Sequence, residues 1–216
     1  MRALSCVLAR EGVSDAWFLA PLLRRAVEQL CAEEFDGIVE VLPVMCLDAD
    51  TQQPAKVIAA AEDVRGTFDV LLFHRDGAPS GKSEEVVRRM RDAWRDLAAD
   101  EPLVAVVPLR ETEAWALADL DALRRVLGLP SVKVAEFAAD LRGTVEQLQD
   151  PKERLGRLIG AATRTGRSDE HTKFLQDFLE RLAEQIEIGR LRKLPAFACW
   201  WTDMTNALEN LGFRYG

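Results

Sequence analysis

Short apolar runs that alternate with helical patterns dominate the first half of this 216-residue chain. Four such runs are too brief for helices and are predicted to be strands: Ala3–Ala9, Gly37–Leu47, Phe68–His74 and Leu103–Leu109. Helices are expected between them, from a cap at Ser14 to Leu30, from Lys56 to Val64, and from a cap at Ser83 to Ala99. Strands joined through helices favour crossover connections. We therefore predict an α/β protein with a mostly parallel four-stranded sheet that is flanked by helices on both faces.

The second half shows helical patterns only. Helices are predicted at Thr112–Leu127, Val134–Leu148, Pro151–Thr163, Thr172–Leu191 and Ala196–Leu211, and a loop is predicted at Arg164–Glu170. The chain accordingly divides into an α/β core at residues 1–111 and a helical C-terminal region at residues 112–216 that packs on the core.

Composition limits the classes of function. Lys and Arg total 28 against 36 Asp and Glu, and the net charge of −8 argues against a broad nucleic-acid footprint, although a local basic surface stays open. No run approaches the ~18 apolar residues of a membrane span, and the opening residues reach Arg10-Glu11 too soon to provide a signal peptide. We expect a cytoplasmic protein without membrane contact. The separated cysteines, without a C-x-x-C pair, predict reduced core residues: Cys6, Cys31, Cys46 and Cys199.

Acidic residues follow three of the four predicted strands. Glu11 and Asp15 come after the first strand, Asp76 after the third, and Glu111 and Glu113 after the fourth. Ligands of open parallel sheets bind beyond the carboxyl ends of the strands, so these loops are expected to converge. Carboxylate oxygens from separate loops suit Mg²⁺ or Mn²⁺, which keeps waters for a phosphate to displace. The alternative is that these acids are solvated and serve helix N-termini, where negative charge is favoured.

The same loops carry a resemblance to a known fold. A strand followed by Glu11-Gly12-x-Ser14-Asp15 and a helix, and a later strand that ends in x-x-Asp76-Gly77, resembles the Toprim fold, the metal-binding module of topoisomerases, primases and OLD-type nucleases. The closer likeness is to an uncharacterised bacterial Toprim-like family near RloB, often associated with phage-defence gene sets. Further similar segments are residues 107–119 (Val-Pro-Leu-Arg-Glu-Thr-Glu-Ala-Trp-Ala-Leu-Ala-Asp), Asp150-Pro151-Lys152-Glu153, His171-Thr172-Lys173 and Pro195-Ala196-Phe197. Together these segments cover most of the chain.

The resemblance implies a nuclease-like, divalent-metal-dependent phosphodiester hydrolase in a prokaryotic phage-defence system, with Mg²⁺ or Mn²⁺ as cofactor. Glu11 matches the Toprim glutamate, which in that fold acts as general acid/base or helps to hold metal. Asp76 matches one aspartate of the Asp-x-Asp pair. Glu111 or Glu113 would complete the metal ligands. Contacts to phosphate or substrate are expected from Ser14, Asp15, His74, Lys82 and Lys152.

The chain departs from the Asp-x-Asp pattern, because His74 and Ala78 stand at the two positions where a second aspartate would lie. A neutral His74 would ligate Mn²⁺ or a softer ion better than Mg²⁺. The other interpretation of His74 is a hydrogen-bonded core residue at the end of a buried strand.

Two other functions remain open at this point. The first is a non-catalytic interaction module, in which the metal site has degenerated and the helical half binds a partner protein. The second is a nucleotide-binding protein that uses Gly77–Ser83, with Lys82 near the phosphate; the P-loop motif has a longer spacing than the three residues that separate Gly77 from Gly81. The sequence leaves open DNA, RNA and protein as partners, and it leaves the oligomeric state open.

Overall fold

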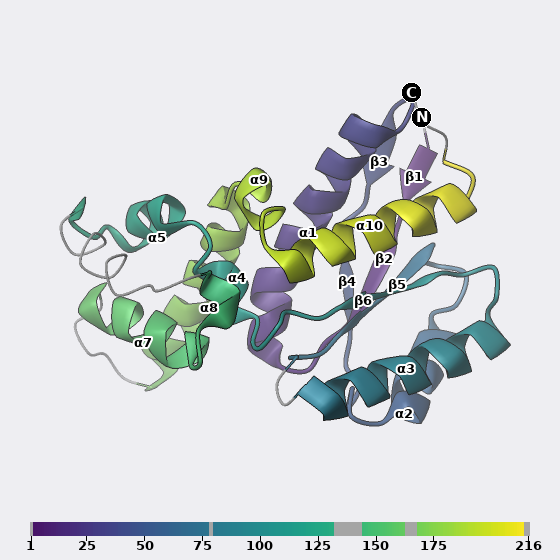
Figure 1. The fold of residues 1–216 in the computed structure, drawn as a ribbon, viewed down its shortest axis with the longest axis horizontal. Coiled ribbons are helices and arrows are strands. Elements are labelled where there is room, and N and C mark those ends of the chain that lie inside the picture. The colour runs from purple at the N-terminus through teal and green to yellow at the C-terminus, as the bar shows by residue number, and fades with distance from the viewer. Residues whose placement is uncertain (1, 78–79, 132–143, 163–167, 214–216) are drawn as a thin grey trace.

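A four-stranded parallel sheet lies at the centre of the computed structural model, which describes residues 2–77, 80–131, 144–162 and 168–213 (Figure 1). Its strand order is β4-β2-β5-β6. The strands are β2 (Cys6–Ala9), β4 (Met45–Leu47), β5 (Val70–His74) and β6 (Leu103–Val106). The predicted α/β architecture with a parallel sheet is confirmed.

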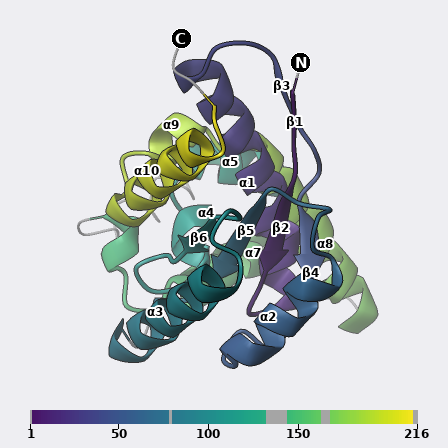
Figure 2. The same ribbon diagram turned by 90° about the vertical axis from the view of Figure 1, so that its right-hand side faces the viewer.

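Helices cover both faces of this sheet, as Figure 2 shows. One face packs against α1 (Val13–Glu34) and α10 (Pro195–Asn210), and the other against α2 (Pro54–Asp63) and α3 (Ser80–Leu97). Successive side chains of a strand point to opposite faces. In β2, Cys6 and Leu8 therefore lie in the core on the α1 side, and Val7 and Ala9 in the core on the α2 side.

The strand order creates a topological switch point between β2 and β5. The chain leaves β2 through α1 to reach β4 on one side, and it leaves β5 through α3 to reach β6 on the other side. In open α/β sheets, the crevice beyond the carboxyl ends of the strands at such a point is the usual place for a ligand. The residues that follow β2 and those that follow β5 lie at this position.

The helical half packs on the sheet. It contains α4 (Glu113–Ala116), α5 (Leu120–Leu127), the 3₁₀-helix η1 (Val145–Gln147), α7 (Pro151–Ala162), α8 (Ser168–Gln185) and α9 (Ile188–Leu191) in addition to α10. Among the described residues, no strand follows β6. Helix α8 contacts α1, α10 contacts β6, and one buried cluster joins residues of both halves. The division at residue 111 stays a prediction.

Two of the predicted strands are each divided into two shorter strands in the structure. The run Ala3–Ala9 forms β1 (Arg2–Leu4) and β2, because the backbone N–H and the hydroxyl of Ser5 both donate to Oδ2 of Asp69, at 2.8 and 2.9 Å. The run Gly37–Leu47 forms β3 (Val39–Val41) and β4, with Pro43, which has no N–H, between them. Strands β1 and β3 pair in parallel as a separate two-stranded sheet.

Several helix boundaries also differ from the predictions. Helix α1 begins after Gly12, so Ser14 is not its cap, and α3 begins at Ser80, before the predicted cap Ser83. The predicted helix Thr112–Leu127 is interrupted because the buried carboxylate of Asp119 accepts from the first backbone N–H groups of α5. The predicted helix Thr172–Leu191 is divided into α8 and α9.

Some predicted segments lie partly outside the described residues. Of the predicted helix 134–148, residues 134–143 are outside and the end forms η1. Of the predicted loop 164–170, residues 164–167 are outside, and Ser168–Glu170 belong to α8, so the loop is wrong there. Cys6 and Cys31 are buried as predicted, whereas Cys46 and Cys199 are exposed. No helix in the described ranges is long and apolar enough to cross a membrane.

Candidate functional site

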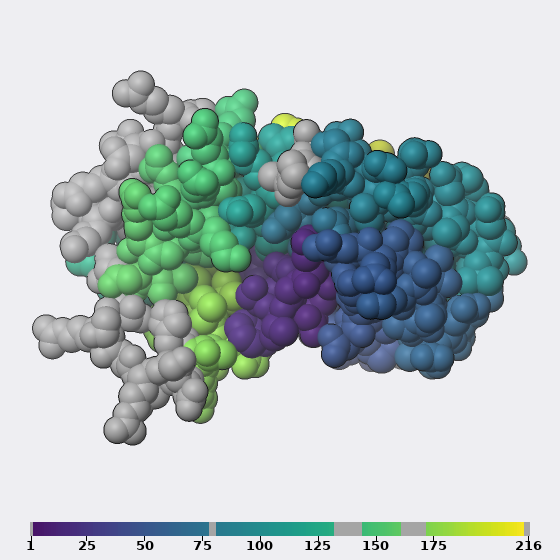
Figure 3. Space-filling model, turned by 90° about the horizontal axis from the view of Figure 1, so that it is seen from below, coloured from purple at the N-terminus to yellow at the C-terminus, as the bar shows by residue number. Residues whose placement is uncertain are grey.

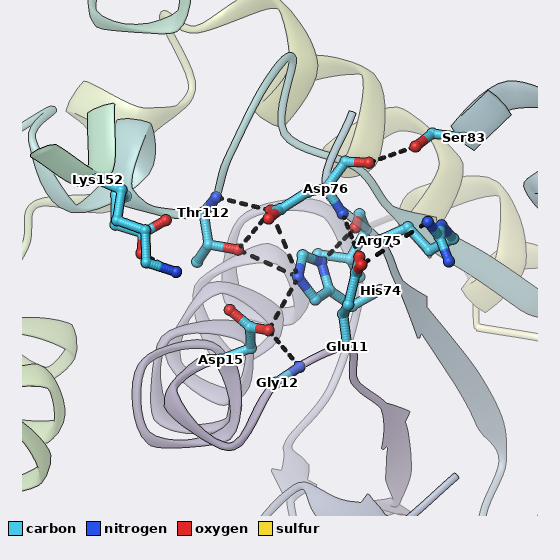
Figure 4. Close-up of polar contacts among 11 residues, drawn as sticks. Glu11, Gly12, Asp15, His74, Arg75, Asp76, Ser83, Thr112 and Lys152 are labelled. Carbon is cyan, nitrogen blue, oxygen red and sulfur yellow. Dashed lines mark hydrogen bonds and ion pairs between the residues drawn. The ribbon is translucent and has the colours of Figure 1, made fainter. Parts of the chain in front are cut away.

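Five residues from three strand ends meet at the switch point, and we call them the switch-point cluster: Glu11, Asp15, His74, Asp76 and Thr112 (Figure 4). Glu11 follows β2, and Asp15 lies in the first turn of α1. His74 is the last residue of β5, and Thr112 precedes α4. Figure 3 shows the molecule from this edge, with the start of the chain in purple between the α7–α8 region in green and the α2 region in blue. The predicted convergence of acidic loops is thus present for Glu11, Asp15 and Asp76.

His74 is fully buried at the centre of this cluster. Its Nδ1 lies 2.8 Å from the carbonyl oxygen of Val106, which can only accept, so Nδ1 carries a proton. Its Nε2 lies 3.1 Å from Oγ1 of Thr112, 3.6 Å from Oδ2 of Asp15 and 3.9 Å from Oδ1 of Asp76. Burial alone would lower the pKa of His74, but the contact with Asp15, the Val106 carbonyl and the charge of Asp76 together raise it. The raised pKa favours the protonated form of His74 among these carboxylates.

Asp15 links His74 to the start of α1. Its Oδ2 accepts the backbone N–H of Gly12 at 2.7 Å, which satisfies a donor that the helix leaves free. Burial alone would raise the pKa of Asp15, but the contacts with His74, the Gly12 amide and Thr112 outweigh burial. The net pKa of Asp15 is therefore below its usual value. Asp15 is consequently an ionised partner of His74 as well as a helix cap, and both roles fix the geometry of the cluster.

Asp76 is held by contacts from three other segments. Its Oδ1 accepts the backbone N–H of Thr112 at 3.0 Å and the Thr112 hydroxyl at 3.4 Å. Its own backbone N–H donates to Oε2 of Glu11 at 3.1 Å, and its carbonyl accepts from the hydroxyl of Ser83 at 2.5 Å. The next residue, Gly77, packs against the backbone of Pro108 and Leu109, and an added Cβ would overlap the carbonyl oxygens of both residues. This tight passage fixes the backbone at Asp76.

Burial and neighbouring charges both act on the pKa of Asp76. Burial raises the pKa of Asp76, the charge of His74 opposes this, and the negative charges of Asp15 and Glu11 raise it further. The net result is a raised pKa, and burial is its largest cause. A cationic ligand would relieve the repulsion from Asp15 and Glu11.

Arg75 is a functional candidate that the sequence did not single out. It is 9% exposed, and its Nη2 lies 3.8 Å from Oε1 of Glu11. Its Nε and Nη1 are buried and have no hydrogen-bond partner in the part of the chain that the structure describes. A buried donor without a partner costs about 1–3 kcal/mol, and a guanidinium matches the geometry of phosphate oxygens. The burial of these donors could not be predicted from the sequence, because it depends on how the fold packs around Arg75.

The remaining predicted residues lie around the cluster rather than in it. Glu111 accepts the backbone N–H of Lys152 at 3.1 Å, so it holds the first turn of α7. Oε1 of Glu113 lies 3.8 Å from Nζ of Lys152. Burial raises the pKa of Glu113; the charge of Lys152 opposes this, and those of Asp76 and Glu111 add to it. Lys82 is exposed in the first turn of α3 and, within the described ranges, makes no hydrogen bond or ion pair with the cluster.

The described residues contain no group of three or more His, Cys, Asp or Glu side chains that could hold a metal ion. The predicted metal ligands are therefore only partly assembled: Glu11 and Asp76 lie together, whereas Glu111 is directed to α7. Mg²⁺ does not require a closed protein site, because it is commonly bound by one or two carboxylates together with waters and substrate phosphates.

Comparison with known proteins identifies the family of the chain. No curated protein and no solved structure matches it. A family model described as "Domain of unknown function (DUF4276)" matches residues 10–205. That range includes the whole switch-point cluster and most of α10. The chain therefore belongs to the DUF4276 family.

Proposed function

We propose that this protein hydrolyses phosphodiester bonds of DNA or RNA with the help of Mg²⁺ or Mn²⁺ bound at the switch-point cluster, as the Toprim-like resemblance implies. The observation that carries the proposal is the state of Asp76, whose pKa is raised by burial and by the nearby charges of Asp15 and Glu11 despite the cation of His74. Carboxylate oxygens at the switch point of a parallel sheet are suited to a hard divalent ion. The prokaryotic phage-defence setting rests on the resemblance alone.

Glu11 and Asp76 are the residues that would hold the ion. Their loops are joined by the hydrogen bond from the Asp76 backbone to Glu11, which keeps the two side chains at one edge. Thr112 occupies Oδ1 of Asp76, and in the described part of the chain Oδ2 accepts no hydrogen bond. A divalent ion at such a site supplies an activated water and stabilises the charge that builds on a phosphate.

The other residues of the site prepare it for an anionic substrate. The guanidinium of Arg75 lies beside Glu11 and has two donors without a partner among the described residues, so it would bind a phosphate oxygen next to the reacting bond. His74 holds Thr112 through Nε2, and Thr112 in turn orients Asp76. In this proposal Asp76 would contribute a positioned carboxylate, and Arg75 would contribute a guanidinium for the phosphate.

A specific observation supports the second candidate, the non-catalytic interaction module. His74 stands where the Asp-x-Asp pattern has a carboxylate, and its imidazolium pairs with both Asp15 and Asp76. A protein whose metal has been replaced by an internal cation would keep the fold and lose the reaction. This candidate predicts a folded protein that neither binds divalent ions nor cleaves nucleic acid.

Cleavage should depend on a divalent ion. We expect the full chain to cleave end-labelled single-stranded DNA or RNA in Mg²⁺ or Mn²⁺ and to be inactive in EDTA, because the carboxylate pair needs the ion to act on a phosphate. Products would be resolved on denaturing gels over a time course. Cleavage that persists in EDTA, or no cleavage of any substrate in either metal, would contradict the proposed function.

A further inference from the structure

An apolar cavity of about 260 Å³ lies beside the switch-point cluster, between α7 and α8. Its walls are aliphatic: Leu155 and Ile159 come from α7, and Leu175 and Leu179 from α8. Ligand sites for drug-sized molecules usually measure roughly 300–1,000 Å³. A cavity just below this range suits one ring system and part of what is attached to it.

Three polar side chains also line this cavity. They are Ser14 of α1, Glu113 of α4 and Lys152 of α7. Together they offer a hydroxyl, a carboxyl group and an ammonium, which can meet both donors and acceptors on the edge of a ligand. An apolar pocket with a few polar groups has the usual composition of a small-molecule site.

A second, smaller cavity has lining residues in common with this pocket and with the switch-point cluster. It measures about 20 Å³, which is enough for one water molecule. It shares Ser14, Glu113 and Leu179 with the larger cavity, and Asp15 and Thr112 of the cluster also line it. The larger cavity therefore lies near Asp15 and Thr112, and the backbone N–H of Thr112 donates to Asp76.

We propose that this cavity binds one unpaired nucleobase of the substrate, next to the phosphate at the switch-point cluster. The proposal rests on the proposed function and names its substrate class as single-stranded nucleic acid or a strand end. Proteins that read an extruded base place it between apolar side chains and hydrogen-bond its edge, as the aliphatic walls and three polar groups here allow. A base that is paired and stacked in a duplex cannot enter a pocket of this size.

Two glycines make the cavity testable without damage to the fold. Gly156 and Gly160 of α7 line it, and a Cβ at either position would meet nothing within 4 Å. Gly156→Leu would place a side chain in the open space, and leucine is a better helix former than glycine by close to 1 kcal/mol. Gly189 of α9 is an exposed helical glycine outside the cavity, with the same open surroundings. Gly189→Leu is therefore the matched control.

The experiment measures binding of nucleoside 5′-monophosphates and of ribose 5-phosphate by calorimetry, with EDTA present so that neither metal nor hydrolysis contributes. We expect at least one nucleotide to bind at least tenfold more tightly than ribose 5-phosphate. Gly156→Leu should weaken that binding at least tenfold and Gly189→Leu should leave it unchanged, with unaltered circular dichroism in both.

Three results would overturn the nucleobase pocket: no binding of any nucleotide, equal binding of ribose 5-phosphate, or unchanged nucleotide binding in Gly156→Leu. These results are distinct from failure of the proposed function. Base binding without metal-dependent cleavage would support the nucleobase pocket and contradict the proposed hydrolysis. Cleavage without base binding would support the proposed hydrolysis and contradict the nucleobase pocket.

Discussion

Asp76→Asn is expected to reduce metal-dependent cleavage by about two to three orders of magnitude, because loss of a metal-binding carboxylate removes several kcal/mol of transition-state stabilisation. The fold should persist. Asparagine keeps a side-chain oxygen that accepts from the Thr112 backbone, as Oδ1 of Asp76 does. The substitution thus removes the charge and keeps the hydrogen bond. Initial rates in saturating Mn²⁺ would measure the effect.

The matched control for this substitution is Asp96→Asn, which makes the same chemical change at an exposed position of α3. It should cleave at the rate of the unaltered protein. Circular dichroism and the melting temperature would verify that both variants are folded. If Asp76→Asn retained more than about a tenth of the original rate, a metal-binding role for this carboxylate would be untenable.

His74→Ala is expected to lower the free energy of unfolding by about 3 kcal/mol, because it removes a fully buried, hydrogen-bonded cation and leaves the charge of Asp15 without its partner. Urea unfolding would measure the loss. A double-mutant cycle with Asp15→Asn would isolate the coupling between the two side chains. A loss of unfolding free energy below about 1 kcal/mol would be no larger than that of a typical substitution. It would contradict a stabilising role for His74 in the switch-point cluster.

The dependence of this effect on pH identifies its electrostatic origin. The folded-state pKa of His74 is raised above its ordinary 6.5, so its stabilisation is complete below that value and is lost as the pH rises through the folded-state pKa. The pKa of Asp15 is lowered below 3.8, so its stabilisation is complete above 3.8 and is lost as the pH falls through the lower value. The difference between the unaltered protein and His74→Ala should thus be largest between the two ordinary pKa values. In EDTA, a difference that increased above pH 6.5 would contradict the ion pair.

The sequence was sufficient to predict the central sheet and the meeting of Glu11 with Asp76. Alternating apolar runs and helices fix a parallel sheet, and the carboxyl ends of its strands share one edge, so the loops that carry these two acids must converge there. The break at Ser5 could not be predicted in this way, because it depends on Asp69, which lies far away in the sequence.

The features of the site that could not be predicted depend on which residues contact one another in the fold, and residue type alone does not determine those contacts. From sequence, His74 could be a metal ligand or a core residue. The structure shows a fully buried side chain that contacts Asp15 and Thr112. Arg75 becomes a candidate only because the fold buries two of its donors without an acceptor from the residues that the structure describes. The cavity between α7 and α8 likewise forms from aliphatic residues that any helix pair would bury.

Titration of the protein with Mn²⁺ by calorimetry tests most directly whether Glu11 and Asp76 together bind a divalent cation. We predict one binding event that is abolished in both Glu11→Gln and Asp76→Asn and retained in Asp96→Asn. These substitutions remove charge and preserve the shape of each side chain, so loss of binding would report the carboxylates themselves. No heat of binding in the unaltered protein, or equal binding in all variants, would contradict the account.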